Sequence, residues 1–81
     1  INEKVEAARQ QVLKGGASPL LFHMEKNMMD IALLAKYMGL PTGKVKRHLE
    51  PDGFAQLDTI LLTQYAEVLL ITVEELKRVP A

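Results

Sequence analysis

Residues 31–50 of this chain, IALLAKYMGLPTGKVKRHLE, decide its fold. At the spacing of two short helices joined by a tight turn, the stretch carries Ala35, Gly39, Leu40 and Val45. Gly39 supplies the left-handed backbone that the turn needs, and Ala35 is small enough to lie where the two helices meet. Leu40 and Val45 fill the angle between the helices. The spacing therefore predicts a helix-turn-helix.

The second of these helices is expected to be basic on its outer side. Its basic or titratable side chains are Lys44, Lys46, Arg47 and His48. Residues 31–50 hold four basic residues and one acidic residue, a net charge of +3, whereas residues 51–81 have a net charge of −3 and the whole chain a net charge of zero. This segregation gives a positive face that would orient the molecule toward phosphate. Double-stranded DNA is therefore the expected partner.

The chain has 81 residues, which is enough for one modest hydrophobic core and too few for two. Residues 17–81 are predicted to form that domain, and residues 1–16 a helical extension outside it. The chain has no cysteine, so disulfides and thiolate metal sites are excluded. The two histidines, His23 and His48, lie far apart in sequence. Neither a metal site nor a cofactor is expected.

The expected compartment is the cytoplasm. No apolar run approaches the roughly 20 residues that a membrane-spanning helix needs. The first residues lack the apolar core of a signal peptide, and the initial Ile1 indicates trimming or an earlier beginning. We therefore expect a soluble cytoplasmic protein.

Apolar spacing and capping signals divide the chain into six helices and no strands. The predicted helices cover residues 3–14, 19–26, 31–38, 43–49, 56–70 and 73–79. The first is amphipathic with a thin apolar stripe of Val5, Ala8, Val12 and Leu13, so it is expected to pack loosely on the body or on a second copy. Apolar residues surround most of the helix over residues 56–70, which is expected to be the most buried helix.

The helix ends are predicted from single residues. The expected N-caps are Asn2, Ser18, Asp30, Thr42 and Thr72. Thr72 and Glu75 form the pattern of a capping box, and Pro80 ends the last helix. The stretch of Pro51, Asp52 and Gly53 is predicted to be a turn, because proline cannot continue a helix and Asp-Gly favours a turn.

Over residues 18–79, about three quarters of the chain, this order of capped helices resembles the lambda repressor and Cro type of DNA-binding domain. Two segments carry the resemblance: Leu34, Ala35, Gly39, Leu40 and Val45 in the helix-turn-helix, then Ile71, Thr72, Val73, Glu74, Glu75 and Leu76 at the closing helix. It implies an all-α, compact bundle of about five helices, here preceded by the amphipathic N-terminal helix. It also implies a prokaryotic or phage transcriptional regulator, which binds DNA as a homodimer and places residues 42–49 in the major groove.

The resemblance implies the contacting residues as well. Thr42, Lys46 and Arg47 would contact base edges or adjacent phosphates. Lys44 and Lys36 would contact phosphates. The alternative, a solvated helix face, is weighed lower because this architecture exposes the helix that carries these residues.

A second hypothesis is a protein interaction module that keeps the helix bundle without a DNA role. Zero net charge favours it. Ile31 and Gly43 also favour it, since they stand where many family members carry a phosphate-binding glutamine and a base-contacting side chain. The N-terminal helix would then bind a partner chain or a second copy.

The remaining residues with chemical potential are interpreted structurally. His48 is expected to be a partly buried packing residue, and His23 an ordinary helix residue. The four methionines, whose helical spacing indicates core filling, are Met24, Met28, Met29 and Met38. The carboxylates interpreted as turn or helix-start residues are Asp52, Asp58, Glu74 and Glu75. No nucleophile, base and orienting group occur together, so an enzyme is not expected.

Overall fold

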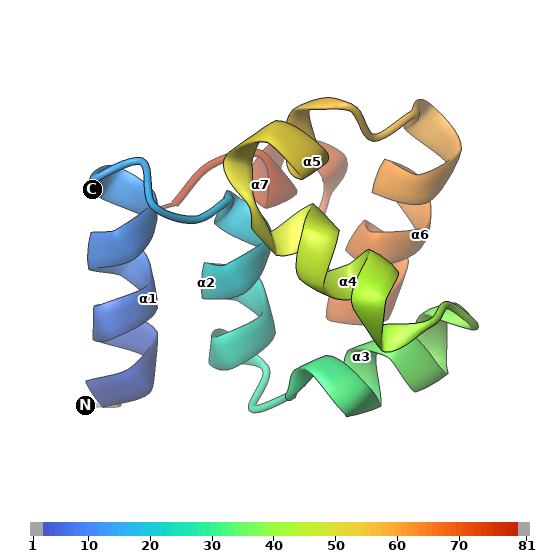
Figure 1. Ribbon diagram of the computed structural model, residues 1–81, viewed down its shortest axis with the longest axis horizontal. Helices are drawn as coiled ribbons and strands as arrows, with labels where there is room; N and C mark the ends of the chain where they lie inside the picture. Colours follow the sequence, from blue (N-terminus) through green and yellow to red (C-terminus); the bar gives the residue numbers. More distant parts are fainter. Residues whose placement is uncertain (1–2, 80–81) are drawn as a thin grey trace.

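The computed structural model describes residues 3–79, which form seven α-helices and no strand (Figure 1). The helices are α1 (Glu3–Leu13), α2 (Pro19–Lys26), α3 (Ile31–Met38), α4 (Thr42–Leu49), α5 (Pro51–Ala55), α6 (Thr59–Leu69) and α7 (Val73–Leu76). The Cα radius of gyration is 11.3 Å, close to the roughly 12 Å expected of a compact domain of this length. The predicted all-α class is confirmed for the described residues.

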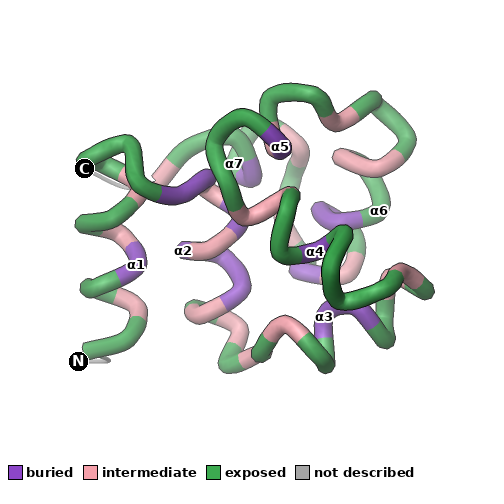
Figure 2. The backbone as a smooth tube through the Cα atoms, viewed as in Figure 1, coloured by how far each residue is buried: buried purple, intermediate pink, exposed green. Residues whose placement is uncertain are grey.

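One hydrophobic core joins five of the helices. The helices α2, α3, α4, α6 and α7 each contribute at least one side chain that is fully buried (Figure 2). These side chains are Leu20, Leu34, Val45, Tyr65, Leu69 and Leu76. Ala35 and Val45 lie in this core as predicted, and Leu40 packs against its edge. Because the core draws on helices from both halves of the chain, it fixes α3 and α4 relative to the rest of the molecule.

The N-terminal helix α1 packs along α2, and the two helices run in opposite directions (Figure 1). Ala8 is buried in this contact, while Val12 is half-buried. Leu13, the fourth residue of the predicted stripe, is 54% exposed. Gly15, with φ of 80°, turns the chain between α1 and α2. The body of the same chain is therefore the surface on which this amphipathic helix lies.

The prediction of a turn at Pro51, Asp52 and Gly53 is wrong, because these residues begin the short helix α5. Pro51 is the first residue of this helix. Proline is tolerated there because a backbone N–H at this position would make no hydrogen bond within the helix. Gly53 is buried, and a Cβ atom there would overlap the backbone carbonyl of Arg47. Gly53 therefore permits a close approach of α5 to the end of α4, and the chain has seven described helices where six were predicted.

The predictions for residues 56–70 need two corrections. The helix α6 begins at Thr59, because the Asp58 side chain caps it by accepting from the Leu61 backbone N–H at 2.8 Å. It is also not the most buried helix, since Ile60 is 70% exposed. The shorter helix α2 buries four of its eight residues: Leu20, Phe22, His23 and Met24. Only one side of α6 faces the core.

Two of the five predicted N-caps, Asp30 and Thr72, are confirmed with their side-chain bonds. Asp30 accepts from the Leu33 N–H at 2.7 Å, and Thr72 and Glu75 form the capping box. Thr42 is the first residue of α4, whose N-cap is Pro41. Helix α7 ends at Leu76, three residues earlier than predicted. The predicted signals at Asn2 and Pro80 lie outside the described residues.

The methionines divide between core and surface. Met24 is buried, and Met29 and Met38 pack against the core. Met28 is 85% exposed in a left-handed conformation, so its predicted core role is wrong. Within residues 3–79, no helix has the length and apolar character needed to cross a membrane.

Candidate nucleic-acid interface

Helix α4 separates its side chains into an inner and an outer set. Val45 is fully buried, and His48 and Leu49 are half-buried. The outer set, all exposed, is Thr42, Lys44, Lys46 and Arg47. We call these four residues the α4 outer surface. The sequence-predicted contact residues of this helix are thus together on one short, solvent-facing element.

The turn before α4 is fixed by a left-handed glycine. Gly39 has φ of 69° and ψ of 31°. The Leu40 N–H donates to the Ala35 carbonyl at 3.0 Å, and the Gly39 N–H donates to the Lys36 carbonyl at 3.3 Å. This pair of bonds is a Schellman motif, which closes the last turn of α3 and directs the chain into α4. The predicted role of Gly39 is confirmed.

Ser18 fixes the other end of α4. Its backbone N–H donates to the Leu49 carbonyl at 2.7 Å, and its hydroxyl donates to the His48 carbonyl at 2.8 Å. The hydroxyl makes no capping bond to α2, although Ser18 holds the N-cap position of that helix as predicted. The last carbonyls of a helix have no partner within it, so Ser18 satisfies two of them and joins α4 to the start of α2.

His48 holds the inner side of α4 against α6. Its Nδ1 lies 2.7 Å from the hydroxyl of Tyr65, and the two rings meet edge to face. Burial lowers the pKa of His48, and the nearby charge of Lys44 lowers it further. Burial also raises the pKa of Tyr65 to about 12, so its hydroxyl keeps its proton at neutral pH. The expectation that His48 is a packing residue is confirmed.

The cations near the α4 outer surface differ in their partners. Arg47 Nη1 lies 2.7 Å from the Glu50 carboxylate, and both side chains are about half exposed. Within residues 3–79, neither Lys44 nor Lys46 forms an ion pair, and the same holds for Lys36 on α3. These three ammonium groups are therefore available to phosphate, whereas the Arg47 guanidinium is already paired with the Glu50 carboxylate. Glu50 was not predicted to act at this surface, although its i, i+3 spacing from Arg47 is a usable signal.

Gly43 leaves a gap in this surface. It is exposed within the first turn of α4, and an added Cβ would meet no atom within 4 Å. A side chain would fit at this position without moving a neighbour. The surface therefore carries its cations on the middle of α4 and backbone alone at Gly43.

His23 belongs to a second polar site that the sequence analysis missed. It is 6% exposed, and its Nε2–H donates to the Arg78 carbonyl at 2.9 Å. It was expected to be an ordinary helix residue. No local signal identified it, because its partner lies 55 positions away. Among residues 3–79, no group of three or more His, Cys, Asp or Glu side chains is placed to hold a metal ion.

Comparisons with models of known protein families, with curated proteins and with solved structures found no match to this chain. The function of the α4 outer surface is therefore argued from its own geometry and charge. This surface carries Lys44 and Lys46, which form no ion pair within residues 3–79, on a helix whose inner side is buried, and Lys36 adds a third such ammonium group on α3.

Proposed function

We propose that this protein is a DNA-binding transcriptional regulator, in which α3 and α4 form a helix-turn-helix and α4 enters the major groove. The observation that carries the proposal is the α4 outer surface itself. Lys44, Lys46 and Arg47 project from a helix whose opposite side is held by the buried Val45. A basic helix that is held from its inner side and exposes its outer side is the element that major-groove recognition needs.

The dimensions of α4 suit this role. An α-helix with its side chains is roughly 10–12 Å in diameter, and the major groove of B-DNA is about 12 Å wide, so a helix such as α4 fits into it. Lys36, Lys44 and Lys46 would neutralise phosphates as point charges. Arg47 would bond two acceptors of one guanine, and Thr42 a base edge or an adjacent phosphate.

The resemblance to the lambda repressor and Cro type supports a homodimer as the active form. Two copies would place their α4 helices in successive major grooves, about 34 Å apart along the duplex. The regulator would act by occupying its site. The zero net charge of the chain means that attraction to phosphate depends on the local excess around α4.

The test is a fluorescence anisotropy titration with a random-sequence duplex at low and moderate salt. Changing both Lys46→Ala and Arg47→Ala should weaken binding and flatten its salt dependence, by about 0.9 in the log–log slope for each phosphate that the variant no longer neutralises. The matched control changes Lys14→Ala and Lys77→Ala, which removes the same charge from exposed positions outside α4. Equal affinity and slope in the two double variants would overturn the proposal.

A protein interaction module without DNA binding is the second candidate. The Arg47–Glu50 pair and the bare Gly43 favour it, because both reduce what α4 offers to a base. The apolar side chains of Leu33 and Tyr37, exposed on α3, also favour it. This candidate predicts no duplex binding even at low salt, together with self-association in sedimentation equilibrium.

A further inference from the structure

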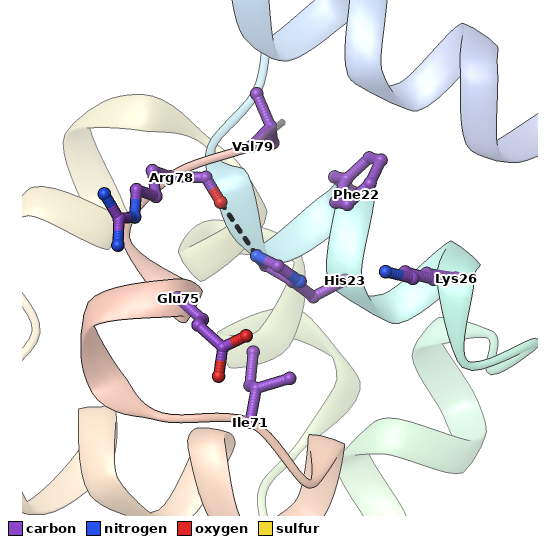
Figure 3. A pocket seen from close by; sticks show the side chains of 7 residues that line it. All are labelled: Phe22, His23, Lys26, Ile71, Glu75, Arg78 and Val79. Carbon is purple, nitrogen blue, oxygen red and sulfur yellow. Dashed lines mark hydrogen bonds between the residues drawn. The ribbon is translucent and has the colours of Figure 1, made fainter. Parts of the chain in front are cut away.

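A pocket of about 430 Å³ lies between α2 and the chain that follows α6 (Figure 3). This volume is within the range of small-molecule sites, about 300–1,000 Å³. Its lining residues are Phe22, His23, Lys26, Ile71, Glu75, Arg78 and Val79. The pocket contains none of the residues of the α4 outer surface, so the proposed DNA-binding role does not explain it.

His23 presents a hydrogen-bond acceptor to the pocket. Because Nε2–H donates to the Arg78 carbonyl, Nδ1 is the ring nitrogen that can accept a hydrogen bond in the neutral tautomer. Nδ1 has no hydrogen-bond partner within residues 3–79. Nδ1 also keeps some accessible surface, since no fully buried side-chain nitrogen or oxygen of the described chain lacks a partner. His23 is therefore a buried ring whose Nε2 is bonded to the chain and whose Nδ1 can bond a ligand.

Charges of opposite sign face the pocket from its two sides. Glu75 reaches it from α7, and Lys26 reaches it from α2, with the His23 ring between them (Figure 3). One Glu75 oxygen accepts from the Thr72 N–H at 3.0 Å, which orients the carboxylate. That hydrogen bond lowers the pKa of Glu75, so the carboxylate is charged at neutral pH. The Arg78 carbonyl accepts from His23, while its guanidinium points away from His23 and its charge also lowers the pKa of Glu75 (Figure 3).

Apolar side chains line the rest of the pocket. Phe22 is buried, and Ile71 and Val79 are half-buried. The Lys26 ammonium lies 5.9 Å from the centre of the Phe22 ring. The pocket thus places two acceptors and the Lys26 ammonium beside an apolar wall. Its complement is a small molecule that carries an ammonium, a carboxylate and an apolar chain.

We propose that this pocket binds a free α-amino acid with an apolar side chain. Its ammonium would donate to the Glu75 carboxylate and to Nδ1 of His23, and its carboxylate would pair with the Lys26 ammonium. Its side chain would contact Phe22 and Ile71. Because the charged groups are partly exposed, each pair contributes modestly, and a dissociation constant on the order of 1 mM is expected.

The first experiment titrates the full chain with L-leucine and follows backbone amide NMR shifts. Shifts at saturation should be confined to residues 22–26 and 71–79. Each analogue that lacks one group should bind at least about threefold more weakly: 3-methylbutylamine without the carboxylate, 4-methylpentanoate without the ammonium, and glycine without the apolar chain. Equal binding of any of these overturns the proposal, as does the absence of shifts at 10 mM L-leucine, roughly ten times the expected constant.

L-Leucinamide is a further arm, because it imitates the first residue of a peptide. If it binds as tightly as L-leucine, the pocket takes a chain N-terminus and the assignment to a free amino acid is wrong. The proposal expects it to bind more weakly, since it has no carboxylate for Lys26.

The second experiment removes one charge at a time. Glu75→Gln should weaken L-leucine binding at least about threefold while keeping the capping box, because glutamine also serves at that position. Glu74→Gln is the matched control, since Glu74 is exposed beside Glu75 and does not line the pocket. Lys26→Gln gives an independent loss, with Lys77→Gln as its control. Equal L-leucine affinity across all four variants overturns the proposal.

The pocket and the α4 outer surface share no residue. The double variant Lys46→Ala and Arg47→Ala should bind L-leucine as the unchanged chain does, because neither residue lines the pocket. A double variant that loses duplex binding and keeps L-leucine binding therefore bears on the proposed function alone. A pocket variant that loses L-leucine binding and keeps duplex binding bears on the pocket alone.

Discussion

The Ser18 hydroxyl donates a 2.8 Å hydrogen bond to the carbonyl of His48 and so ties the start of α2 to the last turn of α4. Ser18→Ala removes this bond and leaves the carbonyl without its side-chain partner. We expect the free energy of unfolding to fall by about 1–2 kcal/mol, measured by urea denaturation. Thr63→Ala, on an exposed position of α6, is the control and should change stability by less than about 0.5 kcal/mol. Equal losses in both would show that the bond between the helices contributes nothing.

We predict that replacing Leu70 by glycine stabilises the protein. Leu70 ends α6 with φ of 59° and is 87% exposed, so it strains the backbone and buries little surface. Leu70→Gly relieves the strain and should raise the free energy of unfolding by roughly 1 kcal/mol. Gly39→Leu is the reciprocal change at a position with the same left-handed backbone. It should lower the free energy of unfolding by a similar amount, because an added Cβ there meets no neighbour and backbone strain is the main cost. A destabilised Leu70→Gly variant would contradict this account.

The helix ends explain which features of the fold could be predicted. Asp30 and the Thr72–Glu75 box bond residues three positions away, so their chemistry is visible in a short window of sequence. Gly39 is visible for the same reason. Leu70 closes its helix with the same left-handed geometry but without the glycine that signals it, since the Ile71 N–H donates to Ala66 and the Leu70 N–H to Glu67.

The interactions that position the two candidate sites could not be predicted in this way. Ser18 and His48 are 30 positions apart, and His23 and Arg78 are 55 apart. Such pairs depend on how the helices pack. Pro51 misled for another reason: a proline marks both the end of one helix and the first turn of the next, and here it does both.

Gly53 and Gly43 predict opposite effects of the same substitution. Gly53→Ala should cost at least about 2 kcal/mol of stability, because its Cβ would overlap the Arg47 carbonyl and the backbone must move. Gly43→Ala should raise stability by up to about 1 kcal/mol, because its Cβ enters open space within a helix. Thermal unfolding of the two variants checks the pair. A tolerated Gly53→Ala would show that α5 does not press against the end of α4.

His48 predicts a pH dependence of stability. Burial and Lys44 hold its pKa below the ordinary value of 6.5 in the folded protein, so the unfolded chain binds the proton more strongly. The contribution of His48 is therefore complete above pH 6.5 and is lost as the pH falls below it. The measurement is urea denaturation between pH 8 and about 5.5, above the range in which carboxylates titrate. His48→Gln should remove this part of the pH dependence, and an unchanged profile would exclude His48 as its source.

Glu50 predicts a gain of DNA binding. Its carboxylate holds the Arg47 guanidinium at 2.7 Å and places a negative charge beside the α4 outer surface. Glu50→Gln should leave stability within about 1 kcal/mol, because the pair is exposed. The same change frees Arg47 for phosphate or guanine and should strengthen duplex binding several-fold at low salt, with a steeper salt slope. Glu67→Gln, which removes the same charge from the exposed surface of α6, is the control. Equal gains in both variants would mean that net charge alone acts, whereas a gain confined to Glu50→Gln assigns the effect to Arg47.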